Sequence, residues 1–463
     1  MSVGDRIGSR YTVQAPEIGR GTFSTVVACR DRVTGQNVAL KITRSCEKYR
    51  VAAMKEVELL TDLNRNDPRR LSPCVWLLAW FEWRRHVCMV FEQLGLNFYD
   101  VMKARDFQPL PMWAVRAVGE QLLSAIFFVH SEMRAVHTDV KLENILLVQP
   151  SHALRLAKAS AFPDSRPLPL KVCLIDFGSC TYDADRHPEV VTTRHYRAPE
   201  VVLKCGWSYP CDMWSVACVL CELYAGELIF PAHDDLGHLM MMERLLGRVP
   251  ENIIRQSGLS ATSNRHLFTR VPRACPRGTD MHRGAAPAGI GASEDKAYTC
   301  LRWNVERVDK KSIQRIRSVH PLRRLLESRL RRLVRFNRNR RTVAHSSAAA
   351  RRSCVCVTAM QSTQTTRQLE GLGNIQCSTC ACQPCHRWMS LYGVDGNEAV
   401  GWCGRNAEAS SSRGPAQHGP RRAFINMVAH AQFQDLCAGM FAYQVSQRFT
   451  ADVALKHAFF SSG

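Results

Sequence analysis

The sequence lacks several features that mark whole classes of protein. Its 463 residues contain no internal repeat and no apolar run close to the ~20 residues that a membrane-spanning helix needs. The opening residues, MSVGDRIGSRYTV, contain no hydrophobic signal-peptide core, so we do not expect secretion. Apolar residues make up 46% and charged residues 22%, which excludes a collagen-like or wholly disordered chain. We therefore expect a globular protein whose 20 cysteines are mostly free thiols in a reducing compartment.

Acidic residues are scarce in the second half of the chain. Residues 1–250 carry 30 Lys and Arg against 28 Asp and Glu, a net charge of +2, whereas residues 251–463 carry 32 against 13, a net charge of +19. A basic protein can attract nucleic acid or acidic surfaces without specificity. Because the first half has almost no excess charge, only the second half fits that description.

Up to about Gly247 the chain has periodic apolar segments separated by short turns. Residues 11–27, 38–42, 145–148 and 172–175 have the Val-rich and Ile-rich pattern of strands, and residues 51–63, 111–130 and 211–226 have helical spacing. Strands dominate the first part and helices the second. This order predicts two lobes, the first rich in β-structure and the second helical.

Two patterns in the first lobe point to phosphate chemistry. GRGTFSTVV, starting at Gly19, lets backbone N–H groups approach a phosphate closely, although a tight hairpin is the simpler interpretation of such a motif alone. Lys41 ends the apolar strand VALK, and Glu56 lies on the next helix. A lysine on an apolar strand needs a carboxylate partner, so a surface lysine fits poorly here.

Two loops of the second lobe add a base and metal ligands. HTDVKLENILL offers Asp139 to accept a hydroxyl proton, Lys141 to stabilise a transferring phosphoryl group, and Asn144 to hold Mg²⁺. In IDFGS, Asp176 follows an apolar strand and can hold a metal. Each residue alone is explained as an ordinary loop residue. Together, and in this order, they match the components of phosphoryl transfer in a protein kinase.

Later residues agree with this interpretation. Ala198-Pro199-Glu200 closes the segment that starts at Asp176, and Asp212 opens an apolar helix. Arg448 lies where kinases place the arginine that pairs with the glutamate of this motif, here Glu200.

The chain resembles the LAMMER, or CDC-like, family of dual-specificity protein kinases of the CMGC group. The resemblance rests on TTRHYRAPEVVL (192–203), GWSYPCDMWSVACVLCELYAGELIFPAHD (206–234) and HLMMMERLLGRVP (238–250). The family is named for a segment that ends in MMER, present here at 241–244. KYRVAAMKEVELL (48–60) and HTD at 137–139 are also similar. It covers about residues 8–250, 301–328 and 433–460.

The resemblance implies an α+β, bilobal kinase fold and an ATP-dependent and Mg²⁺-dependent Ser/Thr kinase with Tyr autophosphorylation. Lys41, Glu56, Asp139, Lys141 and Thr193 would be catalytic, with Thr193 bracing the catalytic loop, and Asn144 and Asp176 would hold the metal. The residues implied to bind the nucleotide are Ile18, Gly19, Gly21, Val26, Ala39, Lys41, Phe91, Glu92, Leu94 and Leu146. The implied partners are Arg/Ser-rich nuclear proteins in splicing, or, in divergent members, proteins of chromosome segregation, and the implied localisation is the nucleus and also the cytoplasm, for a monomer.

The chain departs from the family at a few positions. Ser24 replaces the third glycine of the phosphate loop, which should stiffen that loop, and Met240 replaces the alanine of the LAMMER motif. Leu142 and Ala217 replace a proline and a glycine. Thr138 is uncharged where most kinases have an arginine that pairs with an activation-loop phosphate, so we expect activity without such a phosphate.

The second half contains two segments with open interpretations. Residues 321–341 fit a C-lobe helix with solvated arginines, an import signal or a nucleic-acid contact. CSTCACQPCH, residues 377–386, fits an unstructured insert better than a zinc site, because only one residue separates its two CxxC pairs. Composition makes disorder the expectation for residues 342–422.

These patterns predict the domain organisation. We expect an N-lobe with hinge at 1–94, a first C-lobe part at 95–272, a low-order insertion at 273–299, family-specific helices at 300–328, a disordered, basic, Cys-containing insertion at 329–432 and final C-lobe helices at 433–463. Two other functions remain open, namely a nucleotide-binding scaffold without catalysis and a binding module that acts through the arginines of 329–352.

Overall fold

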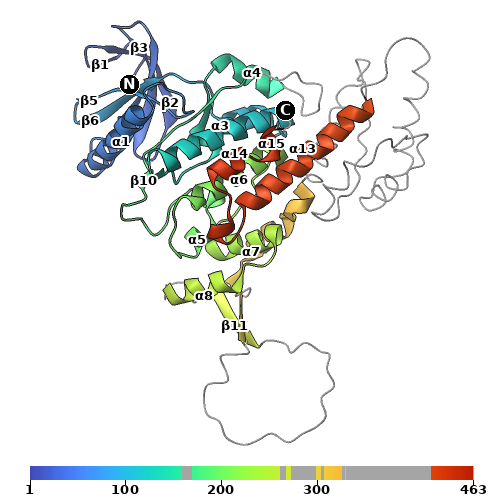
Figure 1. Cartoon of the computed structure of the whole chain (residues 1–463). Helices are drawn as coiled ribbons and strands as arrows, with labels where there is room; N and C mark the ends of the chain where they lie inside the picture. The colour runs from blue at the N-terminus through green and yellow to red at the C-terminus, as the bar shows by residue number, and fades with distance from the viewer. Residues whose placement is uncertain are drawn as a thin grey trace, which may run out of the picture. The chain divides into compact units, whose positions relative to one another are not determined.

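The computed structural model describes residues 1–158, 169–260, 267–272, 299–303, 307–325, 329 and 419–461. The chain divides into two compact units, Met1–Phe336 with Gln434–Gly463 and Asn337–Phe433. The first unit has two lobes that contain all of the predicted catalytic residues (Figure 1). The cysteine cluster at 377–386 lies outside the described residues.

The N-lobe is a six-stranded antiparallel sheet with one helix. The strand order is β1-β2-β3-β4-β6-β5. Its elements are β1 (Arg6–Ile7), β2 (Tyr11–Arg20), β3 (Ser24–Asp31), β4 (Asn37–Thr43), α1 (Glu47–Asn66), β5 (Leu77–Trp83) and β6 (His86–Glu92). The expected strands at 11–27 and 38–42 are therefore present, with the turn between β2 and β3 at residues 21–23.

Alternation along the strands gives the sheet two different faces. On one face Val27, Leu40 and Val90 pack with their neighbours into a closed apolar cluster. The other face carries Lys41, Met89 and the residues in register with them, and α1 covers part of it through Val57 and Leu60. Because successive side chains on a strand point to opposite faces, an apolar core on one side leaves the next residues directed toward the C-lobe.

The C-lobe is mainly helical. Its helices are α2 (Phe98–Ala104), α3 (Met112–Ser131), α4 (Pro150–Lys158), α5 (Pro199–Val202), α6 (Pro210–Ala225), α7 (Asp235–Leu246), α8 (Glu251–Ser260), α9 (Lys310–Ser318), α13 (Gly419–Met440), α14 (Ala451–Leu455) and α15 (Ala458–Ser461). Three strand pairs complete it, namely β7 (Ala135–Val136) with β10 (Thr181–Tyr182), β8 (Ile145–Leu147) with β9 (Val172–Leu174), and β11 (Phe268–Pro272) with β12 (Thr299–Trp303).

Helix α6 is the centre of this lobe. Every residue from Cys211 to Ala225 is buried. The helix ends at Gly226, which has φ of +74° and would place a Cβ only 2.1 Å from the carbonyl oxygen of Phe107. Only glycine fits this position, because it combines a left-handed backbone with a close approach of another chain segment.

Helix α3 is long and strongly apolar. By length and composition, Met112–Ser131 passes the test for a helix that can cross a membrane, with a mean hydropathy of 1.3. In the fold it is a core helix that packs against α6, and half of its residues are buried, among them Val118, Leu122 and Ile126. The apolar content of α3 is therefore accounted for by packing inside the C-lobe.

The segments after Pro250 differ in part from the expectation. The β11–β12 hairpin flanks residues 273–298, which lie outside the described part of the chain. The range 300–328, expected to be helical, contains most of β12 before α9 begins. Leu322–Arg324 forms a 3₁₀ turn, and the rest of the basic run at 321–341 is outside the described residues apart from Leu325 and Arg329. Helix α13 begins at Gly419, within the range expected to lack regular structure.

Candidate active site

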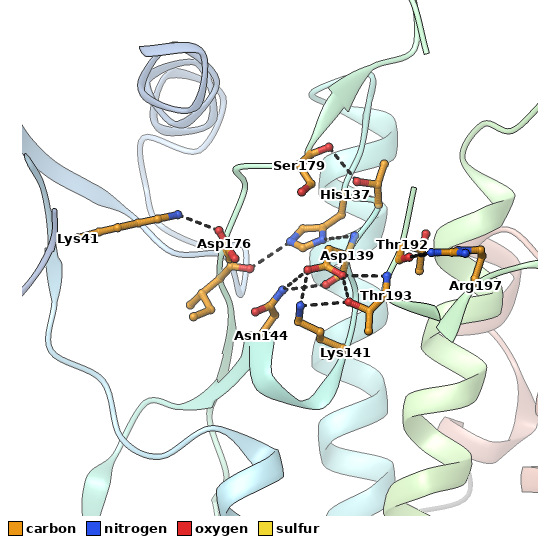
Figure 2. A network of polar contacts seen from close by, with 12 residues as sticks. Lys41, His137, Asp139, Lys141, Asn144, Asp176, Ser179, Thr192, Thr193 and Arg197 are labelled. Carbon is orange, nitrogen blue, oxygen red and sulfur yellow. Dashed lines mark hydrogen bonds and ion pairs between the residues drawn. The ribbon is translucent and has the colours of Figure 1, made fainter. Parts of the chain in front are cut away.

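The loop between β7 and β8 carries the first group of predicted residues, and Figure 2 shows them directed toward one another. The Asp139 carboxylate accepts hydrogen bonds from Lys141 Nζ at 2.5 Å and from the Thr193 hydroxyl at 2.6 Å. The Asn144 amide donates to the Asp139 carbonyl oxygen at 2.8 Å. Three side chains, one of them from a segment 54 residues later, thereby hold Asp139.

Asp212 at the start of α6 fixes the backbone of this loop. It is fully buried, and its two carboxylate oxygens accept from the amide of His137 at 2.7 Å and the amide of Thr138 at 2.8 Å. His130 of α3 lies 2.9 Å from the same carboxylate. A buried carboxylate is tolerated here because several donors satisfy it.

Thr138 has an unusual backbone conformation for a β-branched residue, with φ of +65°. Its amide is bonded to Asp212, and its hydroxyl donates to the carbonyl oxygen of Ser179 at 2.8 Å. Strain of this kind persists only where the surroundings hold the residue in place. The residue before Asp139 is thus an uncharged threonine whose hydroxyl is hydrogen-bonded to the segment after Asp176.

Lys41 of β4 reaches across from the N-lobe to the second group. Its Nζ lies 2.6 Å from Glu56 Oε1 on α1. The same atom lies 2.8 Å from Asp176 Oδ1 (Figure 2). Burial lowers the pKa of Lys41, but the two carboxylates outweigh that effect and raise its pKa above the ordinary value. Burial raises the pKa of Glu56, and Lys41 opposes that rise. Burial also acts to raise the pKa of Asp176, but Lys41 outweighs it and the pKa is lowered, so this carboxylate is ionised at neutral pH.

The two residues after Asp176 lie against α1. Asp176 has φ of +63°, and Phe177 is 1% exposed within the apolar cluster that includes Leu60 and Leu63 of α1. A Cβ on Gly178 would lie 3.2 Å from Glu56 Oε2, a tight contact. The fold therefore brings Lys41, Glu56 and Asp176 together from three separate elements.

The sheet face opposite Asp139 carries the predicted nucleotide-binding residues in adjacent positions. Val26 pairs with both Gly19 and Lys41, and Ala39 pairs with Phe91. Directly paired residues on antiparallel strands share a face, so these side chains form one surface. At its rim lie the more exposed predicted residues Ile18, Gly21 and Glu92, and the partly buried Leu94 follows β6. Leu146 is partly exposed between the buried Ile145 and Leu147, so its side chain lies on the outer face of β8.

The phosphate loop is joined to α1 by contacts that the sequence did not predict. The Gly21 amide donates to the Ser24 carbonyl oxygen at 2.9 Å, and the Arg44 amide donates to that of Phe23 at 2.9 Å. The Phe23 ring stacks on Tyr49 of α1 with centroids 4.5 Å apart. Sequence spacing carries no signal for this pair, because the two rings meet only when the turn folds over the helix.

The expected pair of Glu200 and Arg448 is confirmed. Arg448 Nη1 and Nη2 lie 2.6 and 2.9 Å from the two oxygens of Glu200, and both residues are buried. This bidentate pair connects α5 to the segment before α14, so the last helices are part of the same lobe.

Asn144 and Asp176 carry side-chain oxygens of the kind that bind a small divalent cation. Both offer hard oxygen ligands, and Mg²⁺ is commonly held by one or two carboxylates with the remaining ligands from substrate phosphates and water. The Asn144 amide nitrogen is used by the Asp139 carbonyl, which leaves its side-chain oxygen for a cation. Among the described residues there is no group of three or more His, Cys, Asp or Glu able to bind a metal without a phosphate.

Comparison with known proteins agrees with this geometry. The protein kinase domain family matches residues 12–269. Serine/threonine-protein kinase AFC3 of Arabidopsis thaliana is 44% identical over 266 residues, 56% of this chain and 66% of that protein. Dual specificity protein kinase CLK1 of Mus musculus is 42% identical over 255 residues, 55% of this chain and 52% of that protein. Dual specificity protein kinase lkh1 of Schizosaccharomyces pombe is 40% identical over 261 residues, 56% of this chain and 37% of that protein.

The chain thus spans between about a third and two thirds of these relatives' lengths. A solved structure agrees in fold alone. The crystal structure of the PF14_0431 kinase domain has a TM-score of 0.62 and 20% identity, with 99% of this chain and 98% of that chain covered. The bilobal fold, the paired site residues and the matching family domain lead to one conclusion: this chain belongs to the protein kinase family, in its LAMMER, or CDC-like, branch.

Proposed function

We propose that this chain is an ATP-dependent protein kinase that transfers the γ-phosphoryl group of Mg·ATP to Ser and Thr hydroxyls, with Tyr autophosphorylation. The observation that carries the proposal is the meeting of Lys41, Asp176 and the Asp139 group from separate elements (Figure 2). Phosphoryl transfer depends mainly on positioning and on stabilising charge, and this arrangement supplies groups for both.

Asp139 is the residue suited to receive the proton of the substrate hydroxyl. Lys141 and Thr193 hold its carboxylate, so that it is oriented before the substrate arrives. Lys141 also places a positive charge beside the position where negative charge develops on the phosphoryl group. The hydroxyl oxygen then attacks the γ-phosphorus in line with the departing ADP oxygen.

Lys41, held by Glu56, is the residue suited to bind the α- and β-phosphates. In this arrangement Lys41 also contacts Asp176, so phosphate binding would release that carboxylate toward the metal. Adenine would lie against the surface that includes Ala39, with Phe91 at its inner end and the backbone of 92–94 at the hinge.

Asn144 and Asp176 would hold Mg²⁺. When bound, Mg²⁺ neutralises charge on the phosphates and keeps the γ-phosphoryl group in position.

The substrates that we propose are Arg/Ser-rich nuclear proteins that control RNA splicing, with the nucleus as the main location and a monomer as the active form. The relatives named dual specificity kinases support a hydroxyl-directed kinase. The near-neutral charge of residues 1–250 is compatible with an Arg-rich substrate. Chromosome segregation is the alternative process for the same activity.

The test is phosphate incorporation into an array of peptides with Arg-flanked, acid-flanked and proline-directed serines. We compare the full chain with Asp139→Asn, which keeps the size of the side chain but removes the base. We expect Arg-flanked peptides to be preferred and Asp139→Asn to lower incorporation by about 10²- to 10⁴-fold.

Three results would change the proposal. ATP binding without incorporation would indicate a nucleotide-binding scaffold. A cellular role that persists in Asp139→Asn would indicate a binding module that acts through the basic segment at 329–352. A preference for acid-flanked or proline-directed serines would overturn the substrate class and leave the activity in place.

We also propose that activity needs no activation-loop phosphate at the position before Asp139. The support is that Thr138 is neutral and bonds Ser179 directly, where an arginine would need a counter-charge. Phosphatase-treated enzyme should therefore keep most of its turnover, and loss of nearly all turnover would contradict the proposal.

A further inference from the structure

Tyr182 in the segment after Asp176 contacts both lobes. Its backbone lies in β10 and pairs with Ala135 of β7, the strand that leads into the catalytic loop. Its side-chain hydroxyl donates to Asp62 Oδ2 on α1 at 2.8 Å. Figure 1 shows β10 beside α1, the helix that carries Glu56. One residue thereby connects the strand before Asp139 to the helix that holds Lys41.

Asp62 and Glu56 lie on the same helix, so a bond to Asp62 constrains the helix that carries Glu56. It lies six residues after Glu56 on the same helix, about 9 Å along the axis. Its other oxygen, Oδ1, is 3.0 Å from Arg65 one turn later, and that pair is exposed to solvent. Both oxygens of Asp62 are therefore engaged, one in an exposed pair within the helix and one in a partly buried contact with the other lobe.

The surroundings keep Tyr182 as a hydrogen-bond donor. Its ring packs against the apolar cluster that contains Leu60 and Phe177. Burial, together with the hydrogen bond to Asp62, raises the pKa of Tyr182 well above its ordinary value, so the phenol stays protonated. A hydrogen bond from a phenol to an ionised carboxylate is one of the stronger kinds.

Thr138 stands where most kinases have an arginine that pairs with an activation-loop phosphate. Thr138 is neutral, so the segment after Asp176 is not fixed by a phosphate at that position. Along that segment, Phe177 contacts α1 by packing and Tyr182 contacts it by a directed hydrogen bond. The hydrogen bond depends on direction as well as distance, so it constrains the rotation of α1 relative to this segment more closely than packing does.

We propose that Tyr182 and Asp62 are positioning residues, whose hydrogen bond holds α1 in the orientation that presents Glu56 to Lys41. This inference rests on the proposed kinase activity. Neither residue touches the phosphates, so the bond acts on catalysis only through the Lys41–Glu56 pair.

The experiment is a double-mutant cycle of Tyr182→Phe and Asp62→Ala in the full chain, with kcat and KM measured separately for ATP and for a peptide. Tyr182→Phe removes one oxygen and keeps the ring. We expect each single variant to lower kcat/KM for ATP by about five- to tenfold, and the double variant to be no worse than either. The peptide KM should stay unchanged.

Two variants serve as controls. Arg65→Ala removes the other partner of Asp62 and should leave kcat/KM for ATP at the wild-type value. Asp62→Asn keeps an acceptor oxygen without the charge and should recover part of the loss seen in Asp62→Ala.

A second readout separates this inference from the proposed function. Hydrogen exchange of the α1 amides near Glu56 should be faster in Tyr182→Phe than in Arg65→Ala, whether or not the wild-type chain phosphorylates anything. Loss of stability without a change in kcat/KM or in α1 exchange would overturn the positioning role. So would additive effects in the double variant.

Discussion

The two sides of the active site are built differently. On the C-lobe side, Asp139 is held by neighbours whose backbone is bonded to Asp212, a residue that is 0% exposed. On the N-lobe side, Phe23 at the tip of the phosphate loop is 50% exposed, and Lys41 depends on carboxylates from two other elements. The C-lobe loop is fixed by one buried carboxylate, whereas the N-lobe side combines an exposed phosphate loop with an ion-pair cluster whose members come from three elements.

This difference matches the different tasks of the catalytic base and of the phosphate loop. The base must keep one geometry, which burial of its supports provides. The phosphate loop must open and close around a nucleotide, which requires few buried contacts. Mutations at the buried supports of Asp139 should therefore reduce stability and activity together, and mutations in the exposed phosphate loop should reduce activity with smaller changes in stability.

The largest effect is expected for Asp212→Ala. The change leaves two backbone amides and His130 without their acceptor in the interior, and should lower the free energy of unfolding by about 3–5 kcal/mol. Urea denaturation measures this. The matched control is Asp235→Ala on α7, whose carboxylate pairs with Arg194 and is 39% exposed, and it should cost less than about 1 kcal/mol. Equal losses in the two variants would show that burial of the Asp212 carboxylate is not the source of its contribution to stability.

Lys41→Met should have a large effect on activity. Without its positively charged group, kcat/KM for ATP should fall by about 10²- to 10³-fold, because a preorganised charge at the phosphates is lost. The change also leaves the buried Glu56 without its partner, which costs stability, so the unfolding midpoint is measured beside turnover. A variant with near-normal turnover would contradict the role given to this residue.

Glu222 is buried in the C-lobe, and its titration can be tested by measuring the free energy of unfolding against pH. Burial raises the pKa of Glu222 from its ordinary value of 4.5 to about 7, and the Tyr196 hydroxyl that donates to it opposes this rise. Because the folded protein binds this proton more tightly, the contribution of Glu222 to stability is fully present below pH 4.5 and is lost as pH rises through about 7, by about 3 kcal/mol in total. Glu222→Gln should avoid that loss, so its advantage in urea denaturation should appear at pH 8 and vanish at pH 4. An advantage independent of pH would exclude titration of Glu222 as its cause.

The smallest effect is expected for the stacked pair that joins the phosphate loop to α1. Tyr49→Ala removes the ring under Phe23, and aromatic pairs contribute about 0.5–1.5 kcal/mol. We expect KM for ATP to rise by about two- to tenfold, with kcat and the unfolding midpoint almost unchanged. Tyr49→Phe keeps the ring and should behave as wild type, and an equal defect in both variants would show that the hydroxyl matters and the stacking does not.

Much of the fold was predictable from sequence because local patterns specify it. The helices at Glu47–Asn66 and Pro210–Ala225 follow apolar spacing, and the Glu200–Arg448 pair followed from family position. The expectation for residues 300–328 missed β12, because a short strand forms only when β11 is beside it. The apolar spacing of α3 predicted a helix, but its position in the interior depends on α6 and other neighbours.

The sequence by itself determined which chemical groups are available and in what order, because motif spacing and residue type are local properties of the chain. It predicted Lys41, Asp139, Asn144 and Asp176 as one set before any contact was known. Only the tertiary structure decided which residues support that set from a distance, such as Tyr182 on Asp62 and Phe23 on Tyr49. Those contacts join residues 120 and 26 positions apart, and their partners are fixed by how the lobes and helices pack, which no local pattern encodes.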